Sequence, residues 1–251
     1  MTAFIDVAVV ATPDAPGDVA FLLAQGAQRW DASRVEGGVT PARARLVFLL
    51  VDAPAAVQQR WLAALGALVD ADTTVALYAP RLSVSELAAA YPHPAQVVGV
   101  GFLDGRLAPG SVVEVAPGLR SAPGAVERVE AFFRQAGVAT ERVGDFSGLV
   151  LRRVLYMIIN EATYALWEGV ASREDIDLGM KLGVGYPFGP LEWADAIGLD
   201  RVHDGLRSLH EEYGDDRFRP CPLLRKMVAA GLTGRRAGAG FYTYGAAEGA
   251  R

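Results

Sequence analysis

Cysteine, histidine and net charge are all scarce in this sequence. Cys221 is the single cysteine among 251 residues, so no disulfide can form within the chain, as is usual for proteins of a reducing cytosol. It stands between two prolines with no histidine nearby in sequence, and is expected to be a packed side chain, not a nucleophile. The three histidines are too scattered to suggest a metal site. His203 and His210 fall on a helical stretch and are expected at the surface or at its edge.

Several classes of partner are also excluded by what is missing. The formal net charge of -5 argues against a nucleic-acid surface. No apolar run reaches the roughly 18 residues that a membrane span needs, and the first residues lack the basic-then-apolar layout of a secretion signal. The sequence therefore predicts a cytoplasmic protein that binds neither nucleic acid, nor membrane, nor metal.

The first 144 residues alternate short apolar runs, rich in β-branched residues, with amphipathic stretches. Such alternation is typical of a mostly parallel sheet flanked by helices. The first run, its turn and the next helix resemble the opening of a dinucleotide-binding βαβ unit. Ser83 and Glu86 have the spacing of a capping box at a helix start. The expected strands are 4–11, 45–51, 73–79, 95–102, 111–115 and 138–143, and the expected helices are 19–25, 54–69, 83–90 and 126–136.

The alternation stops near Gly144, and helical patterns continue from there to the end. This predicts two domains, 1–144 and 145–251. The stretch 149–166 is apolar on nearly every face. A helix of that kind is expected to be buried on all sides, at the centre of a domain or in a dimer interface.

The second domain carries a series of spaced motifs. Its centre, 185–200, places a Pro-Phe-Gly-Pro turn before an amphipathic helix that Gly198 closes. The other motifs are Asn160-Glu-Ala162, Glu174-Asp-Ile-Asp177, Pro222-Leu-Leu224 and Gly234-Arg-Arg-Ala-Gly-Ala-Gly-Phe-Tyr-Thr-Tyr244.

This series resembles the C-terminal domain of the 3-hydroxyacyl-CoA dehydrogenase family, which acts in fatty acid metabolism. The resemblance implies a Rossmann-like α/β sheet domain followed by an all-α domain that forms the dimer interface and one wall of the acyl-CoA cleft. Matching positions in that wall are Arg152, Pro187, Gly189 and Pro190.

In the family, three glycines let the NAD pyrophosphate approach the backbone. The resemblance puts Ala11, Pro13 and Pro16 at those places, and proline has no N–H to donate to a phosphate. No cofactor is therefore expected. Asp31 falls near the position of a ribose-binding acid and is a weak candidate for that role. The segment 32–43 leaves no room for the helical excursion with which the family holds CoA.

The resemblance also implies a His–Glu pair as the catalytic base system, with a Ser and an Asn holding the substrate oxygen. Gly101 stands at the His position, Pro80 at the Ser and Arg152 at the Asn, whereas Glu114 matches the Glu. Without its base, Glu114 is expected to have a structural or salt-bridging role. Ser83 is offset and is expected to cap a helix. Arg152 either makes the cleft cationic, which suits a carboxylate or phosphate, or lies exposed on its helix or pairs with Glu114.

Three functions follow. The first is a non-catalytic family member that forms a homodimer, or a heteromer with an active homologue, and binds an acyl-CoA or another anion. The second is a working NAD-dependent oxidoreductase with a rearranged site, in which NAD binds despite Pro13 and Pro16. The third is a purely structural partner subunit. The missing base and glycines favour the first.

Overall fold

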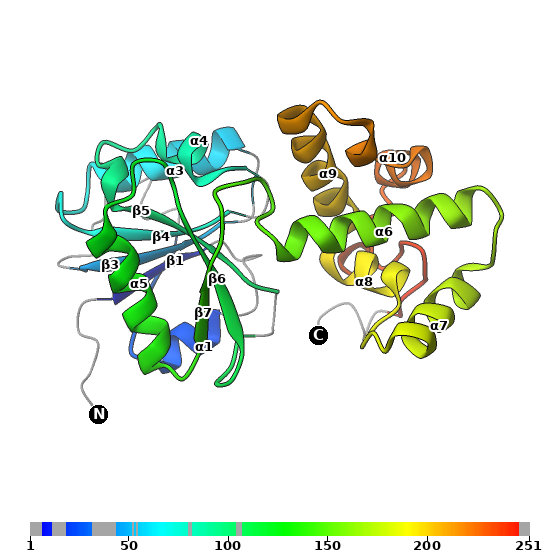
Figure 1. Cartoon of the computed structure of the whole chain (residues 1–251), viewed down its shortest axis with the longest axis horizontal. Coiled ribbons are helices and arrows are strands. Elements are labelled where there is room, and N and C mark those ends of the chain that lie inside the picture. Colours follow the sequence, from blue (N-terminus) through cyan, green and yellow to red (C-terminus); the bar gives the residue numbers. More distant parts are fainter. Residues whose placement is uncertain are drawn as a thin grey trace. The chain divides into compact units, whose positions relative to one another are not determined.

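The chain forms two compact units, Met1–Leu151 and Arg152–Arg251, called here the sheet unit and the helical unit (Figure 1). The computed structural model describes residues 7–11, 19–31, 44–51, 53, 55–79, 82–103 and 107–245, without the side chains of 30, 31 and 55. The segment 145–151 belongs to the sheet unit, in which Asp145 Oδ2 accepts a hydrogen bond from the Ser85 amide at 3.0 Å. A domain boundary at Gly144 remains a prediction.

The sheet unit is built on seven strands in the order β2-β1-β3-β4-β5-β6-β7. Within this sheet, neighbouring strands run parallel except for the antiparallel pair β5 and β6. This confirms the predicted Rossmann-like, mostly parallel sheet. The strands are β1 Val7–Ala11, β2 Gln28–Asp31, β3 Leu46–Leu50, β4 Thr74–Tyr78, β5 Val97–Gly101, β6 Val112–Pro117 and β7 Ala139–Arg142.

Helices cover both faces of the sheet, and the alternation of side chains along the strands supplies both cores. In β3, Phe48 packs on the face of α5, where its ring centroid lies 4.8 Å from that of Phe132. Its neighbour Leu49 belongs to the opposite core, with Leu62 of α3. The helices of this unit are α1 Val19–Ala24, α3 Ala55–Gly66, α4 Val84–Ala88, the 3-10 turn η1 Pro94–Gln96 and α5 Pro123–Gln135.

The helical unit confirms the predicted all-α second part. Ser172 starts α7, where its Oγ accepts the Asp175 amide at 3.1 Å, and Gly185 ends α7 with a φ of 71°. Gly198, at a φ of 105°, closes α8 as predicted. Its elements are α6 Leu151–Trp167, α7 Arg173–Val184, α8 Pro190–Ile197, α9 Leu199–Tyr213, η2 Asp216–Phe218, α10 Pro222–Ala229 and η3 Arg235–Ala237.

The prediction that the apolar stretch 149–166 is buried on all sides is wrong for the single chain. Helix α6 buries one side through residues such as Leu155 and Ile159, whereas Val154 is 53% exposed. The reason is that only part of its circumference packs against other helices of the unit. A dimer interface on the exposed side remains a prediction.

The scarce residues lie in ordinary packing environments. Cys221 is fully buried, as predicted for a packed side chain. The His203 side chain is 14% exposed and that of His210 is 37% exposed, which fits a helix edge and the surface respectively. Within the described ranges, no group of three or more metal-ligating side chains comes together. No helix of those ranges is long and apolar enough to cross a bilayer.

Candidate functional site

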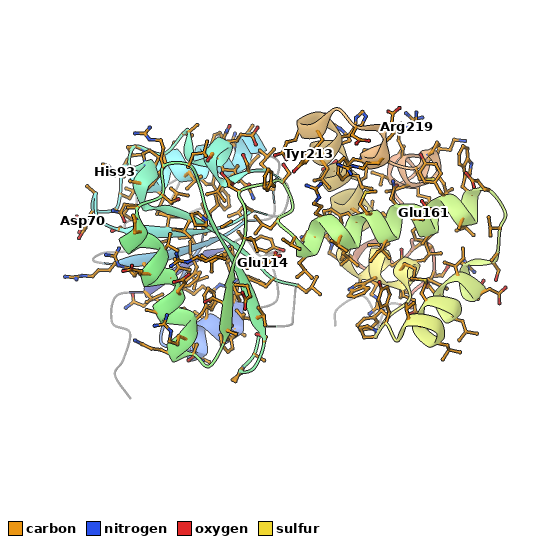
Figure 2. All side chains as sticks on the ribbon, in the orientation of Figure 1. Asp70, His93, Glu114, Glu161, Tyr213 and Arg219 are labelled. Carbon is orange, nitrogen blue, oxygen red and sulfur yellow. The ribbon has the colours of Figure 1, made fainter. Side chains whose placement is uncertain are left out.

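The centre of the candidate site lies where β5 ends beside β6. The antiparallel register pairs Gly101, at the position implied for the base, with Glu114, so the two are direct cross-strand neighbours. Figure 2 labels Glu114. A Cβ added at Gly101 would lie 2.7 Å from Glu114 Oε2 and 2.7 Å from Leu149 Cδ1. A side chain at this place would therefore require the ends of the Glu114 and Leu149 side chains to shift.

The Glu114 carboxylate also forms hydrogen bonds at the start of α6. Its Oε1 accepts hydrogen bonds from the amides of Val150 at 3.1 Å and Leu151 at 2.8 Å. The first amides of a helix have no partner within the helix, and a carboxylate there also interacts favourably with the helix dipole. The Glu114 carboxylate thus acts as a cap for α6.

His93 is far along the strand from this site. It precedes η1, which leads into the amino end of β5, whereas Gly101 is the last residue of that strand. A shift of one or two residues in the strand register cannot bring His93 from the amino end of β5 to its carboxyl end. His93 therefore does not replace the base implied at Gly101.

Helix α4 begins beside the same site and confirms the predicted capping box. The Glu86 amide donates to Ser83 Oγ at 3.3 Å, and the Ser83 amide donates back to Glu86 Oε2 at 3.3 Å. Asp145 adds a carboxylate to the same helix start. Ser83 is thus placed as a cap.

The expected cofactor edge is only partly described. The sheet order reverses at β1, with β2 on one side and β3 on the other, and the carboxyl ends of such strands form the ligand crevice of this fold class. Ala11 ends β1, is 1% exposed and pairs in register with Asp31. Pro13, Pro16 and Pro80 lie outside the described residues.

The residues expected in the substrate wall differ in their exposure. Arg152 is 2% exposed, and its Nη1 lies 3.4 Å from the Tyr156 hydroxyl, so the alternative of an Arg exposed on its helix is wrong. The side chain is buried because it lies on the packed side of α6. Gly189 and Pro190 are buried at the start of α8, and Pro187 is exposed.

Two buried carboxylates, which sequence reasoning did not assign, hold the helical unit together. Asp177 accepts the amides of Leu191 at 2.8 Å and Glu192 at 3.0 Å, and the Tyr242 hydroxyl at 2.8 Å. Gly189 starts α8 without a side chain, so Asp177 supplies the cap from α7. An added Cβ at Gly189 would lie 2.1 Å from Asp177 Cγ.

Asp195 has the same role for the C-terminal motif. It accepts the amides of Phe241 and Tyr242, each at 2.9 Å, and the Tyr244 hydroxyl at 2.8 Å. Burial raises the pKa of Asp195, and these donors act in the opposite direction. In the sequence, these contacts are indicated only by the presence of the motif Asp residues and of the Tyr-Thr-Tyr sequence. That pattern does not show which carboxylate accepts a hydrogen bond from which hydroxyl.

A sheet whose order reverses at β1, with one antiparallel pair β5–β6, and a separate all-α unit define a two-part protein with a Rossmann-like first part. Residues 148–244 match the family model described as the 3-hydroxyacyl-CoA dehydrogenase C-terminal domain. The chain is 41% identical over 172 residues to a probable 3-hydroxybutyryl-CoA dehydrogenase of Bacillus subtilis, and 40% identical over 180 residues to one of Deinococcus radiodurans. Those matches cover 68% and 72% of this chain, and 60% and 64% of the relatives.

Solved structures agree with these matches. FadB2 of M. tuberculosis superposes with a TM-score of 0.81 at 26% identity, over 97% of this chain and 100% of that one. The (S)-3-hydroxybutyryl-CoA dehydrogenase PaaH1 of Ralstonia eutropha gives 0.79 at 27% identity, over 95% and 99%. Through residues 148–244, the chain belongs to the 3-hydroxyacyl-CoA dehydrogenase family. The sequence matches span only about two thirds of the length of the curated relatives, namely 60% and 64%.

Proposed function

We propose that this chain is a non-catalytic member of its family, which keeps the scaffold and binds an acyl-CoA or another anion or a partner chain. The observation that carries the proposal is the pairing of Gly101 with Glu114. Gly101 offers no titratable group, and the side-chain ends of Glu114 and Leu149 lie where its Cβ would be. A missing general base typically lowers a rate by about a hundred- to ten-thousand-fold.

The cofactor side supports the same proposal. Pyrophosphate binding in this fold class depends on backbone amides at a glycine-rich turn. The sequence places Ala11, Pro13 and Pro16 at the corresponding positions. Two prolines remove two donors, and their rings add bulk where the phosphate would approach. This donor set does not fit NAD, and no step through the cofactor is assigned.

The helical unit offers features for binding instead of catalysis. Arg152 is a buried cation at the position implied for the substrate-holding Asn, which suits a carboxylate or phosphate group. The proposed partner surface is the exposed apolar side of α7. Isolated apolar side chains are normal at a surface, but Leu178 and Leu182 lie one helical turn apart on the same side of α7, and such a group marks an interaction site. Their exposed fractions are 50% and 78%.

A cytoplasmic homodimer, or a heteromer with an active homologue, is the assembly that we propose. Light scattering of the purified chain measures the mass directly. We expect a dimer, and dissociation when Leu182, which is 78% exposed, is changed to Asp. A monomer at micromolar concentration that also fails to co-purify with a homologous dehydrogenase would rule out this surface.

The alternative is an active NAD-dependent oxidoreductase that acts on a 3-hydroxyacyl-CoA through a rearranged site. It is favoured by one finding, that relatives at 41% and 40% identity are named as probable 3-hydroxybutyryl-CoA dehydrogenases. In this alternative Glu114 would have to leave the start of α6 and take part in proton transfer.

Absorbance at 340 nm, with acetoacetyl-CoA and NADH, separates the two proposals. We expect no turnover above the rate without protein, and no saturable change in NADH fluorescence when protein is added. The Bacillus subtilis relative serves as the positive control for substrate quality. Turnover that survives further purification and is lost in Glu114→Gln would establish the alternative, because a contaminating enzyme would not respond to that substitution.

A further inference from the structure

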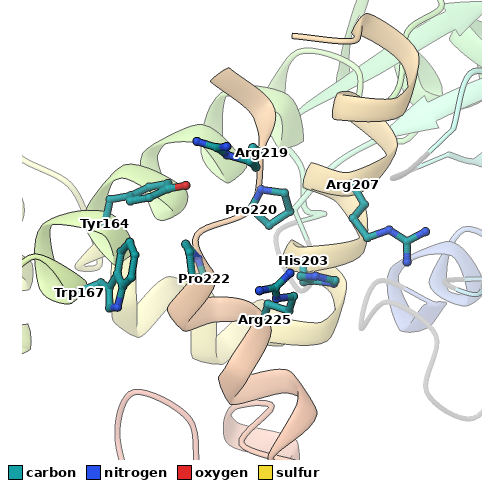
Figure 3. Close-up of a pocket in the computed structure, with 8 residues that line it drawn as sticks. All are labelled: Tyr164, Trp167, His203, Arg207, Arg219, Pro220, Pro222 and Arg225. Atoms are coloured by element: carbon teal, nitrogen blue, oxygen red, sulfur yellow. The ribbon is translucent and has the colours of Figure 1, made fainter. Parts of the chain in front are cut away.

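The helical unit carries a pocket of about 500 Å³ that has no part in the site around Glu114 (Figure 3). This volume is in the range of small-molecule sites, which is about 300–1,000 Å³. Its apolar walls are the rings of Tyr164 and Trp167 from α6 together with Pro220 and Pro222. The two aromatic rings lie with their centroids 6.1 Å apart and edge toward face.

The rest of the lining is basic, and none of the lining residues carries a carboxylate. Arg207 forms an ion pair with Glu211 at 3.1 Å, which offsets its charge. Among the described residues, Arg219 and Arg225 have no carboxylate partner, so two guanidinium charges remain available. Figure 3 shows Arg219 pointing toward Tyr164 and Arg225 lying beside His203. The basic lining consists of His203, Arg207, Arg219 and Arg225.

The wall that carries Arg219 is held in place by Asn160 of the Asn160-Glu-Ala162 motif. The Asn160 side chain is buried, and its Nδ2 donates to the Arg219 carbonyl at 3.0 Å. Its Oδ1 accepts the Cys221 amide at 2.9 Å. The residues on either side of Cys221 are prolines with fixed φ. A wall that is ordered in advance lowers the entropy cost of binding.

We propose that this pocket binds a phosphorylated compound with a planar ring, of the size of a nucleoside monophosphate. Guanidinium groups bind phosphate oxygens in pairs of parallel hydrogen bonds, which a lone lysine cannot do. A planar ring stacks on the face of Trp167, with the inclined Tyr164 ring beside it as a second apolar wall, since stacking on aromatic side chains tolerates many ring types. The proposal does not depend on whether the chain is catalytic.

Isothermal titration of the full chain with AMP, adenosine and inorganic phosphate tests this. We expect saturable binding of AMP, and much weaker binding of adenosine and of phosphate, because each lacks one half of the recognised chemistry. Arg225→Gln is expected to weaken AMP binding by about tenfold or more, the usual effect of losing a hydrogen bond to a charged group. Trp167→Leu is expected to weaken it by roughly 5- to 100-fold.

The matched control is Lys226→Gln, which removes the same charge from the next residue of α10, an exposed side chain outside the pocket lining. We expect it to leave AMP binding unchanged within about twofold. Arg219→Gln provides a second pocket variant if Arg225→Gln has an altered melting temperature. Equal weakening by Lys226→Gln and Arg225→Gln would overturn the site, as would adenosine or phosphate binding as tightly as AMP. Absence of saturable AMP binding up to millimolar concentration overturns it as well.

Discussion

The two units use the residues of the family resemblance in different ways. In the helical unit, Asp177 and Asp195 each accept three hydrogen bonds, and Gly189 leaves the space that Asp177 occupies. In the sheet unit, Gly101 leaves space that Glu114 fills, and Glu114 caps a helix. The helical motifs are therefore required by packing, whatever the chemistry. A resemblance that rests on these motifs therefore indicates the fold. Whether the chain is active depends on the residues of the sheet unit.

The largest effect is expected where a motif residue of the helical unit is removed. Asp195→Ala leaves the amides of Phe241 and Tyr242 and the Tyr244 hydroxyl without their acceptor in a buried place. Each unsatisfied group costs about 1–3 kcal/mol. We expect a loss of about 3–5 kcal/mol in the free energy of unfolding, measured by urea denaturation followed by circular dichroism.

The control for Asp195 is Asp200→Ala. Asp200 is an acid of the same unit whose side chain is 42% exposed and lies 3.5 Å from Arg236. Its removal is expected to cost less than about 1 kcal/mol. Similar losses for the two variants would mean that the C-terminal motif is not held by Asp195, and the contrast between the units would lose its main support.

A smaller effect with opposite signs is expected from two glycines of the helical unit. Gly189→Ala places a Cβ 2.1 Å from Asp177 Cγ, although the backbone φ of -68° suits any residue. We expect a loss of about 1–3 kcal/mol from overpacking. Gly179 in α7 has no atom within 4 Å of an added Cβ, so Gly179→Ala is expected to gain about 0.5–1 kcal/mol. Thermal unfolding measures both, and a stabilised Gly189→Ala would contradict the packing argument.

Much of the fold follows from sequence because local patterns determine it. The short apolar runs predicted β3 and β4, and the Ser83–Glu86 spacing predicted the start of α4. The all-round burial predicted for α6 failed for a physical reason. An apolar composition shows that a helix can be buried, but the number of neighbouring helices decides how much of it is buried.

The sequence predicted which positions belong to the candidate site, but not how their side chains are arranged. The sequence placed Gly101 and Glu114 on two strands, but the register that makes them direct neighbours is a long-range property. The same holds for Arg152, because a stretch that is apolar on nearly every face does not show which side of α6 will be packed. The pocket around Arg219 and Arg225 draws on three helices and carries no signal in any one of them.

The sheet unit is tested by Glu114→Ala. Loss of the carboxylate leaves the amides of Val150 and Leu151 without their acceptor, and we expect a cost of about 1–2 kcal/mol. Glu114→Gln keeps an oxygen that can accept one of these bonds and is expected to lose less. Urea denaturation gives both values. Full stability of Glu114→Ala would show that this carboxylate is not needed as a cap and is available for other chemistry.

The smallest effect is expected at Ser83, which caps α4 in the same unit. Ser83→Ala removes the hydroxyl that accepts the Glu86 amide, and the usual cost of such a change is about 1 kcal/mol. Asp145 still accepts the Ser85 amide there, so part of the cap survives. Ser83 has a structural role alone, whereas Glu114 also occupies a position implied for catalysis. The affinity of each variant for an acyl-CoA separates these roles. If both variants are less stable but bind the acyl-CoA as the unchanged chain does, the two residues are equivalent caps. If Glu114→Ala also changes that affinity and Ser83→Ala does not, the sheet unit retains part of a substrate site.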